Sequence, residues 1–386
     1  MTFYGYRRPD GRVGVRNRVL ILPASVCATD TARIIAQQVE GAISFNNQQG
    51  CSQVAPDQQF TMDVMAGYAA NPNIYGTVVV SLGCENCQMD LVVKAIEERT
   101  NKPLKQVIIQ ESGGTLKAID KAVRYAKEMV EEASLLQKEK FPISELILGT
   151  ECGGSDPTSG LAANVLIGQL SDLLVQAGAT SILSETTEFI GAEHILARRA
   201  ATPEVRDRIF EIVHRYEKAL QMVGEEVRKG NPSPGNKAGG ITTLEEKSLG
   251  CIHKGGHSPV MEVYDYAKQV EAKKGLVIMD TPGHDPSSVA AMVAGGAQVV
   301  VFSSGRGTPT GNPIAPVIKI TGNRITYANM IDNIDVDASP LIYGGDLKEM
   351  GEELLKLLVE VASGKQTKAE SLGYTEMAIA RACNYV

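Results

Sequence analysis

Residues 145–177 read ELILGTECGGSDPTSGLAANVLIGQLSDLLVQA, and the pattern of this segment indicates the fold class. Its short apolar run at 145–149 predicts a buried strand. Glycines and polar residues at 150–156 predict a tight turn. The nearly continuous apolar run at 163–177 predicts a core helix. A strand, a turn and a helix in this order form the repeating unit of a parallel sheet covered by helices.

The same unit recurs along the chain. Runs rich in β-branched residues predict further buried strands, at 18–22, 76–82, 106–110, 180–184, 276–280, 297–303 and 316–320. Between them lie helical patterns, including 114–136 and the amphipathic stretch 203–228. We therefore expect an α/β protein with a mostly parallel sheet, helices on both of its faces and a second α/β domain. The polar stretch 136–142 predicts the boundary between domains at 1–140 and 141–386.

Composition narrows the classes of function. The chain has 386 residues, of which 43% are hydrophobic and 22% charged, so it is long enough for two packed domains. Its net charge of −7 argues against nucleic acid as a partner. No apolar run is long enough to span a membrane, and residues 1–8 lack the apolar stretch of a signal peptide. A cytoplasmic enzyme or binding protein is the expectation.

Three of the seven cysteines share a distinctive setting. The odd count without a secretion signal indicates reduced thiols. Cys51, Cys84 and Cys152 each have a glycine neighbour and lie near predicted strand ends, so we expect their sulfurs to converge at one edge of a sheet. Thiolates select iron, zinc or an iron–sulfur cluster. The alternatives are plain packing under glycine turns, or a zinc half-site or redox pair at Cys84 and Cys87.

Polar clusters follow other predicted strands. Glu185 and His194 follow one strand, and Asp280 and His284 follow another. Helix capping is the alternative role for such acidic residues, and a surface position is the alternative for a histidine. The loop 304–312 contains Arg306 among glycines and resembles an anion-binding loop.

The segment 231–250 is the most unusual in the chain. It combines a rigid Pro/Gly loop with Lys237, and Thr242 or Thr243 is placed to cap a helix that contains Lys247. We interpret it as a binding segment for an anionic substrate, with a solvated loop as the alternative.

Several long motifs also resemble one family. GYRRPDGRVGVRN at 5–17, CGGSD at 152–156, NPSPGNKAGG at 231–240 and MDTPG at 279–283 look like the altronate/galactarate dehydratase family over almost the whole chain. The resemblance implies iron-dependent removal of water from a sugar acid to give a 2-keto-3-deoxy acid. It also implies a dimerisation domain followed by a Rossmann-like domain, and hence a homodimer.

The resemblance leaves two alternatives. Family members carry a small N-terminal β-clip domain, which should precede Gly5 here, so we expect a separate small β-clip subunit as a partner. The large subunit of sulfolactate sulfo-lyase is built from the same core alone and is the first alternative. The elements at Cys51 and Cys84 favour the hydroxy-acid dehydratases. The second alternative is a non-catalytic sugar-acid-binding subunit.

The residues and the resemblance together give a predicted site. The metal, Fe²⁺ or an iron–sulfur cluster with Mn²⁺ as a further option, is assigned to Cys51, Cys84, Glu85, Cys152 and Asp280. Oxygen and nitrogen ligands from Glu185, His194, Asp280 or His284 are the alternative. The catalytic candidates are His194, Lys237, His284 and Glu185. Groups suited to binding carboxylates and hydroxyls are Arg16, Asn17, Ser155, Asp156, Lys237, Arg306 and Asn312.

Overall fold

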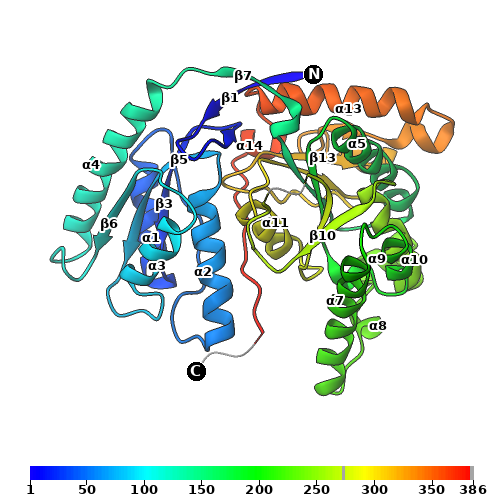
Figure 1. Cartoon of the computed structure of the whole chain (residues 1–386), viewed down its shortest axis with the longest axis horizontal. Coiled ribbons are helices and arrows are strands. Elements are labelled where there is room, and N and C mark those ends of the chain that lie inside the picture. The colour runs from blue at the N-terminus through cyan, green and yellow to red at the C-terminus, as the bar shows by residue number, and fades with distance from the viewer. Residues whose placement is uncertain (272–273, 383–386) are drawn as a thin grey trace.

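The computed structural model describes residues 1–271 and 274–382 (Figure 1). Its largest sheet has seven parallel strands in the order β10-β11-β9-β8-β12-β13-β14. The strands are β8 (Ile147–Cys152), β9 (Thr180–Leu183), β10 (Val260–Tyr264), β11 (Gly275–Met279), β12 (Val299–Ser303), β13 (Val317–Thr321) and β14 (Val336–Asp337). The α/β class predicted from the sequence is confirmed.

Helices cover both faces of this sheet because its strands are apolar on both sides. Val299 and Val301 of β12 pack in one core with α5 (Asn164–Gln176) and α13 (Leu347–Ala362). The alternating residues Val300 and Phe302 pack in another core with α11 (Asp285–Ala294). Side chains that alternate along a strand between two hydrophobic cores, one on each face of the sheet, are typical of a central parallel strand.

A second parallel sheet lies in the N-terminal part, in the order β4-β3-β5-β6. Its strands are β3 (Arg18–Pro23), β4 (Ala42–Ile43), β5 (Ile74–Ser81) and β6 (Leu104–Ile108). Helices α1 (Val26–Gln37) and α4 (Thr115–Ser134) share one core with it. The opposite core contains α2 (Ala55–Ala70) and α3 (Met89–Glu97).

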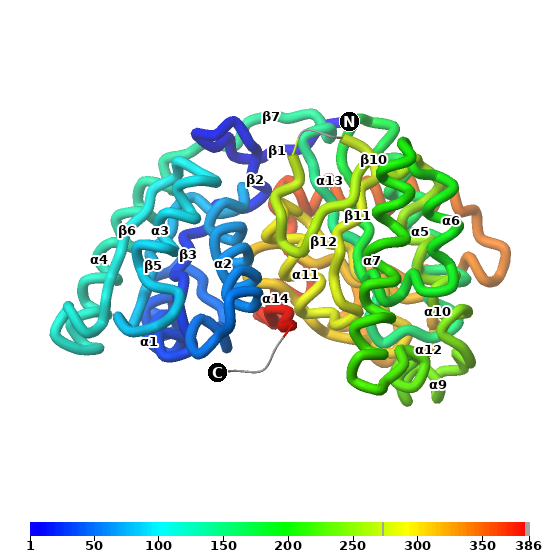
Figure 2. The backbone as a smooth tube through the Cα atoms, turned by 60° about the horizontal axis from the view of Figure 1, so that its bottom comes forward, coloured from blue at the N-terminus to red at the C-terminus, as the bar shows by residue number. Residues whose placement is uncertain are grey.

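The two sheets are joined by close helix packing. Helix α2 lies against α11 (Figure 2). A Cβ at Gly67 would lie 2.7 Å from the Ala294 Cβ, so only glycine permits this approach. A small antiparallel sheet of β1 (Thr2–Arg7), β2 (Val13–Gly14) and β7 (Glu139–Pro142) pairs the N-terminus with the connection between the sheets.

The segment after β9 departs from the prediction. Helix α7 (Pro203–Met222) ends six residues before the expected position 228, because the chain turns at Gly224 with φ +75°. The stretch 230–240, expected to be loop, contains helix α9 (Pro234–Gly239), which a Ser233–Asn236 capping box begins. The remaining helices are α6 (Glu193–Ala197), α8 (Val227–Gly230), α10 (Leu244–Ile252), α12 (Arg324–Asn329) and α14 (Lys368–Ser371).

Within the described residues, no helix has the length and apolar character required to cross a membrane. The six described cysteines are free thiols. Cys383 lies outside the described residues.

Candidate active site

The strongest candidate site lies at the carboxyl ends of the central strands in the seven-stranded sheet. Strand β8 lies between β9 and β12, so the strand order changes direction there. Ligands in open parallel sheets bind at such a point. Two cavities of about 720 and 280 Å³ open beside the end of β8, and Cys152, Glu188 and Lys247 line both.

A buried ion pair forms the base of the site. Lys254 pairs with Glu185, and both side chains are 0% exposed. The Lys254 Nζ also donates to Cys251 Sγ at 3.1 Å. Burial acts to lower the pKa of Lys254, but Cys251 and Glu185 outweigh it, so the pKa is raised and the ammonium form persists. Glu185 has φ +72°, a left-handed backbone that is strained for a non-glycine residue.

A second ion pair lies at the junction of the cavities. The Lys247 Nζ is 2.6 Å from Glu188 Oε1, and the two side chains are 10% and 2% exposed. Lys247 also donates to Asn231 Oδ1 at 3.1 Å. Burial opposes the charge on Lys247, but Glu188 raises its pKa above the ordinary value. This lysine is therefore a fixed cation facing the ligand space.

At the end of β8, both the backbone N–H and the thiol of Cys152 lie in the site. The Cys152 N–H donates to Glu185 Oε2 at 3.0 Å, and its Sγ lies 2.8 Å from Ser155 Oγ. Burial raises the pKa of the Cys152 thiol. A side chain at Gly153 would overlap the Asp285 carboxylate and lie 2.7 Å from Phe302 Cζ, so glycine is required there.

Two further buried titratable residues, Glu151 and Lys319, lie on strands β8 and β13 of the same sheet. Glu151 accepts from Ser184 Oγ at 3.1 Å and Ser288 Oγ at 2.7 Å, and burial raises its pKa to about 8. Lys319 is cross-strand from Phe302, with its Nζ 3.3 Å from the ring centroid. Burial lowers the pKa of Lys319 to about 7.

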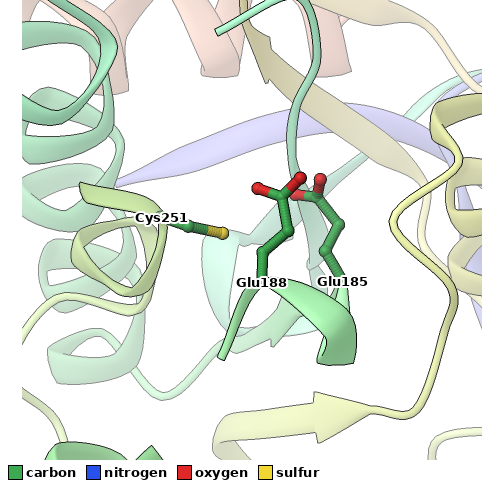
Figure 3. Close-up of side chains that lie close together, drawn as sticks. All are labelled: Glu185, Glu188 and Cys251. Atoms are coloured by element: carbon green, nitrogen blue, oxygen red, sulfur yellow. The ribbon is translucent and has the colours of Figure 1, made fainter. Parts of the chain in front are cut away.

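The donor groups in this site fit a divalent cation. Glu185, Glu188 and Cys251 offer ligand atoms that all lie within 4.8 Å of one another (Figure 3). Glu185 Oε1 and Glu188 Oε2 are buried and have no hydrogen-bond partner among the described residues. Leaving such atoms unmatched is costly, so these two oxygens are available to bind a cation, a proton or a water molecule.

The walls of the larger cavity carry more acidic than basic side chains. The larger cavity is lined by four carboxylates, against two lysines; these residues are Glu188, Glu225, Glu226, Asp285, Lys229 and Lys247. An anionic ligand would meet net repulsion there unless a cation were bound as well.

The predicted cysteine cluster is not brought together. Cys51 and Cys84 lie beside the four-stranded sheet, whereas Cys152 ends a strand of the seven-stranded sheet. The expectation failed because strand-end motifs of two different sheets were assigned to one edge. Among the described residues, the groups of three potential ligands within 4.8 Å include neither Cys51 nor Cys84.

The two predicted acidic metal ligands have other partners. Glu85 accepts from the backbone N–H groups of Leu82 at 2.9 Å and Gly83 at 2.6 Å, which closes the turn after β5. Asp280 accepts from Thr186 Oγ1 at 2.7 Å and pairs with Arg215.

The four predicted catalytic residues do not lie together in the structure. Glu185 lies at the centre of the site. His284 is exposed next to Asp285, and its Nδ1 lies 2.9 Å from Ser287 Oγ. His194 and Lys237 are exposed, and neither lines either of the two cavities.

Of the predicted binding residues, Ser155 and Asp156 line the smaller cavity. Asp156 also holds Thr158 Oγ1 at 2.5 Å and Asn323 Nδ2 at 2.8 Å. Arg306 is exposed and outside both cavity walls.

The other three predicted binding residues join parts of the fold. Arg16 binds Glu370 at 2.7 Å, and Asn17 accepts from Arg8 at 2.7 Å. Asn312 donates to the Tyr68 hydroxyl at 3.1 Å. Their side chains are committed to these contacts and line neither cavity.

Several central groups were not among the predicted site residues, namely Glu151, Glu188, Cys251, Lys254, Asp285 and Lys319. For Lys319 a signal existed, since a lysine inside the apolar strand β13 is unusual. Lys254 follows the end of α10 and carried no such signal.

Comparison with known proteins agrees with these motifs. A family model described as "D-galactarate/Altronate dehydratase, C-terminal" matches residues 143–384. A second, "D-galactarate dehydratase/Altronate hydrolase, second domain", matches residues 5–134.

Similar proteins include two named dehydratases and one named sulfo-lyase subunit. Altronate dehydratase of Bacillus subtilis (strain 168) is 36% identical over 98% of this chain and 77% of its own length. Galactarate dehydratase (L-threo-forming) of Escherichia coli (strain K12) is 34% identical over 95% of this chain and 73% of its own length. (2R)-sulfolactate sulfo-lyase subunit beta of Chromohalobacter salexigens is 36% identical over 98% of this chain and 97% of its own length. The chain therefore belongs to the D-galactarate/altronate dehydratase family of hydro-lyases.

Proposed function

We propose that this protein is a metal-dependent hydro-lyase that dehydrates a sugar acid of the altronate or galactarate type to a 2-keto-3-deoxy acid. The observation that carries the proposal is the position of the Lys247–Glu188 pair, with an unpartnered oxygen on Glu188, beside a cavity of about 720 Å³. Family membership supports the reaction class.

Lys247 is the proposed binding group for the substrate carboxylate. Its Nζ lies at the junction of both cavities, and its raised pKa keeps it charged. A fixed ammonium there stabilises the negative charge that gathers on the carboxylate when the α-proton leaves. Lys247 replaces Lys237 in this role, because Lys237 lies outside the cavity walls.

Asp285 is the proposed proton acceptor. It lines the larger cavity, and Gly153 leaves room for its carboxylate. In the proposed reaction, Asp285 takes the α-proton, and the C–O bond to the β-hydroxyl breaks. Asp285 then returns the proton to the leaving hydroxyl, which departs as water. The resulting enol tautomerises to the keto acid.

The proposed metal ligands are Glu185, Glu188 and Cys251. Carboxylate and thiolate donors together suit Fe²⁺, and Mn²⁺ is the alternative that the carboxylates favour. When bound, a divalent ion would supply positive charge to the carboxylate and to the departing hydroxyl. The same ion would offset the excess of acidic groups in the cavity.

A second copy of the chain and a small β-clip subunit are proposed as protein partners. One relative is itself named a subunit, which supports a multi-subunit form. Size-exclusion chromatography with light scattering, with and without a co-expressed small subunit, tests both partners.

The test of the reaction is an anaerobic assay with protein loaded with Fe²⁺ or Mn²⁺. Six-carbon aldonates and aldarates are supplied, and keto-acid formation is measured. Sulfite release from sulfolactate is measured in parallel, since one relative is named for that activity. Keto-acid formation supports the proposal. Sulfite release alone, or binding of sugar acids without turnover, overturns it.

A further inference from the structure

We infer that the outer wall of the larger cavity, defined here as Glu225, Glu226 and Lys229, selects sugar acids with one carboxylate over those with two. This inference rests on the proposed function and deepens it. All three residues line the cavity and lie between the end of α7 and the end of α8.

The outer wall has no unpaired cation for a second carboxylate. Its lysine, Lys229, lies with Nζ 3.4 Å from Glu225 Oε2. Glu226 has no ion pair among the described residues, so the wall carries net negative charge. Arg228 pairs with Glu245 at 2.7 Å and is not part of the cavity lining.

The other groups near this wall suit uncharged hydroxyls. Asn231 and Ser233 line the same cavity, and an amide and a hydroxyl both donate and accept hydrogen bonds. Lys247, the proposed partner of the reacting carboxylate, lines the same cavity and donates to Asn231 Oδ1 at 3.1 Å. A six-carbon aldonate would therefore place its carboxylate at Lys247 and its neutral hydroxymethyl end at the outer wall.

An aldarate of the same length meets a different environment. Its second carboxylate would face Glu226 without a compensating lysine. Like charges about 4 Å apart in water repel by about 1 kcal/mol, which corresponds to roughly a fivefold loss. The preference is electrostatic, so salt must weaken it.

The experiment compares kcat/KM for a six-carbon aldonate and the matching aldarate, in metal-loaded protein at low and high salt. The variants are Glu226→Gln and Glu226→Lys. The control is Glu128→Lys, an exposed residue on α4 with the same change in charge. Inhibition of aldonate turnover by the aldarate gives a second readout.

We expect the aldonate to be preferred by about fivefold or more at low salt, with a smaller ratio at high salt. Glu226→Lys should lower the ratio and strengthen inhibition by the aldarate, while Glu128→Lys leaves both unchanged. An equal or reversed preference in the wild type, or one that Glu226→Lys leaves intact, overturns the inference. If neither acid is dehydrated, the proposed function fails instead. In that case, calorimetry measures the affinity of the protein for each of the two acids. The difference between the two affinities then tests the charge preference without turnover.

Discussion

Lys247 Nζ lies 2.6 Å from Glu188 Oε1, and this pair stands where the two cavities meet. One member of the pair is the proposed anchor for the substrate carboxylate, and the other is a proposed metal ligand. Substrate and metal would therefore bind next to each other, so that charge developing on the substrate lies close to two cations.

Replacing Lys247 with Met should raise KM for the sugar acid by about 30-fold, because a buried charged hydrogen bond to a carboxylate is lost. Steady-state kinetics in metal-loaded protein measure the effect. Lys237→Met is the matched control and should change KM by less than about twofold, since surface groups contribute little. The reverse ranking would assign the carboxylate to Lys237.

Gly153→Ala should lower kcat by about a hundredfold or more, because the added methyl would displace the Asp285 carboxylate from the cavity. Overpacking should also cost about 1–3 kcal/mol in unfolding free energy. Gly235→Ala is the control, since a Cβ there meets only Ser233 Oγ at 3.9 Å. Normal turnover by Gly153→Ala would remove Asp285 from the proposed mechanism.

Lys254→Met and Glu185→Gln test the buried pair. Each single change leaves a buried polar group without its partner and should cost about 3–5 kcal/mol of unfolding free energy. The double variant should cost clearly less than the sum of the two, and denaturant unfolding of all four proteins measures the coupling. Strict additivity would show that the pair contributes no direct interaction.

Lys319→Met should stabilise the fold in a pH-dependent way. Burial depresses the pKa of Lys319 to about 7, so the folded state binds the proton less tightly than the unfolded state does. The resulting penalty is full below pH 7 and shrinks as the pH rises toward the ordinary lysine value. The variant should be more stable by about 1–3 kcal/mol at pH 6 and by less at pH 9. A gain that is the same at both pH values would contradict the depressed pKa.

The sequence predicted the central strands well because they are buried on both faces. The apolar runs at 147–149 and 299–302 carry a strong signal of this kind. The short or edge strands β1, β2, β7, β10 and β14 were not predicted. Their residues are partly exposed, or the strands are too short for a periodic pattern of hydrophobic residues to appear.

The site was predicted only in part, because proximity in space depends on strand order. The motif at Cys152 was correctly placed at a strand end. Glu185, one of the alternative ligands predicted for the metal, lies in a group of potential ligands. Cys51 and Cys84 looked equivalent to Cys152 by local pattern, yet they follow strands of the other sheet. The buried lysines have no local motif, and only the fold shows that they neutralise the acidic groups.

Anaerobic metal analysis tests the central claim most directly. Purified protein is loaded with Fe²⁺, desalted, and analysed for bound iron in the wild type, in Glu188→Gln, in Cys251→Ser and in the double variant Cys51→Ser/Cys84→Ser. We predict about one iron per chain in the wild type and in the double cysteine variant, and a strong loss in Glu188→Gln and Cys251→Ser. Circular dichroism confirms that each variant is folded. Retained iron in Glu188→Gln and Cys251→Ser, together with its loss from the double cysteine variant, would contradict the account and place the metal at the four-stranded sheet.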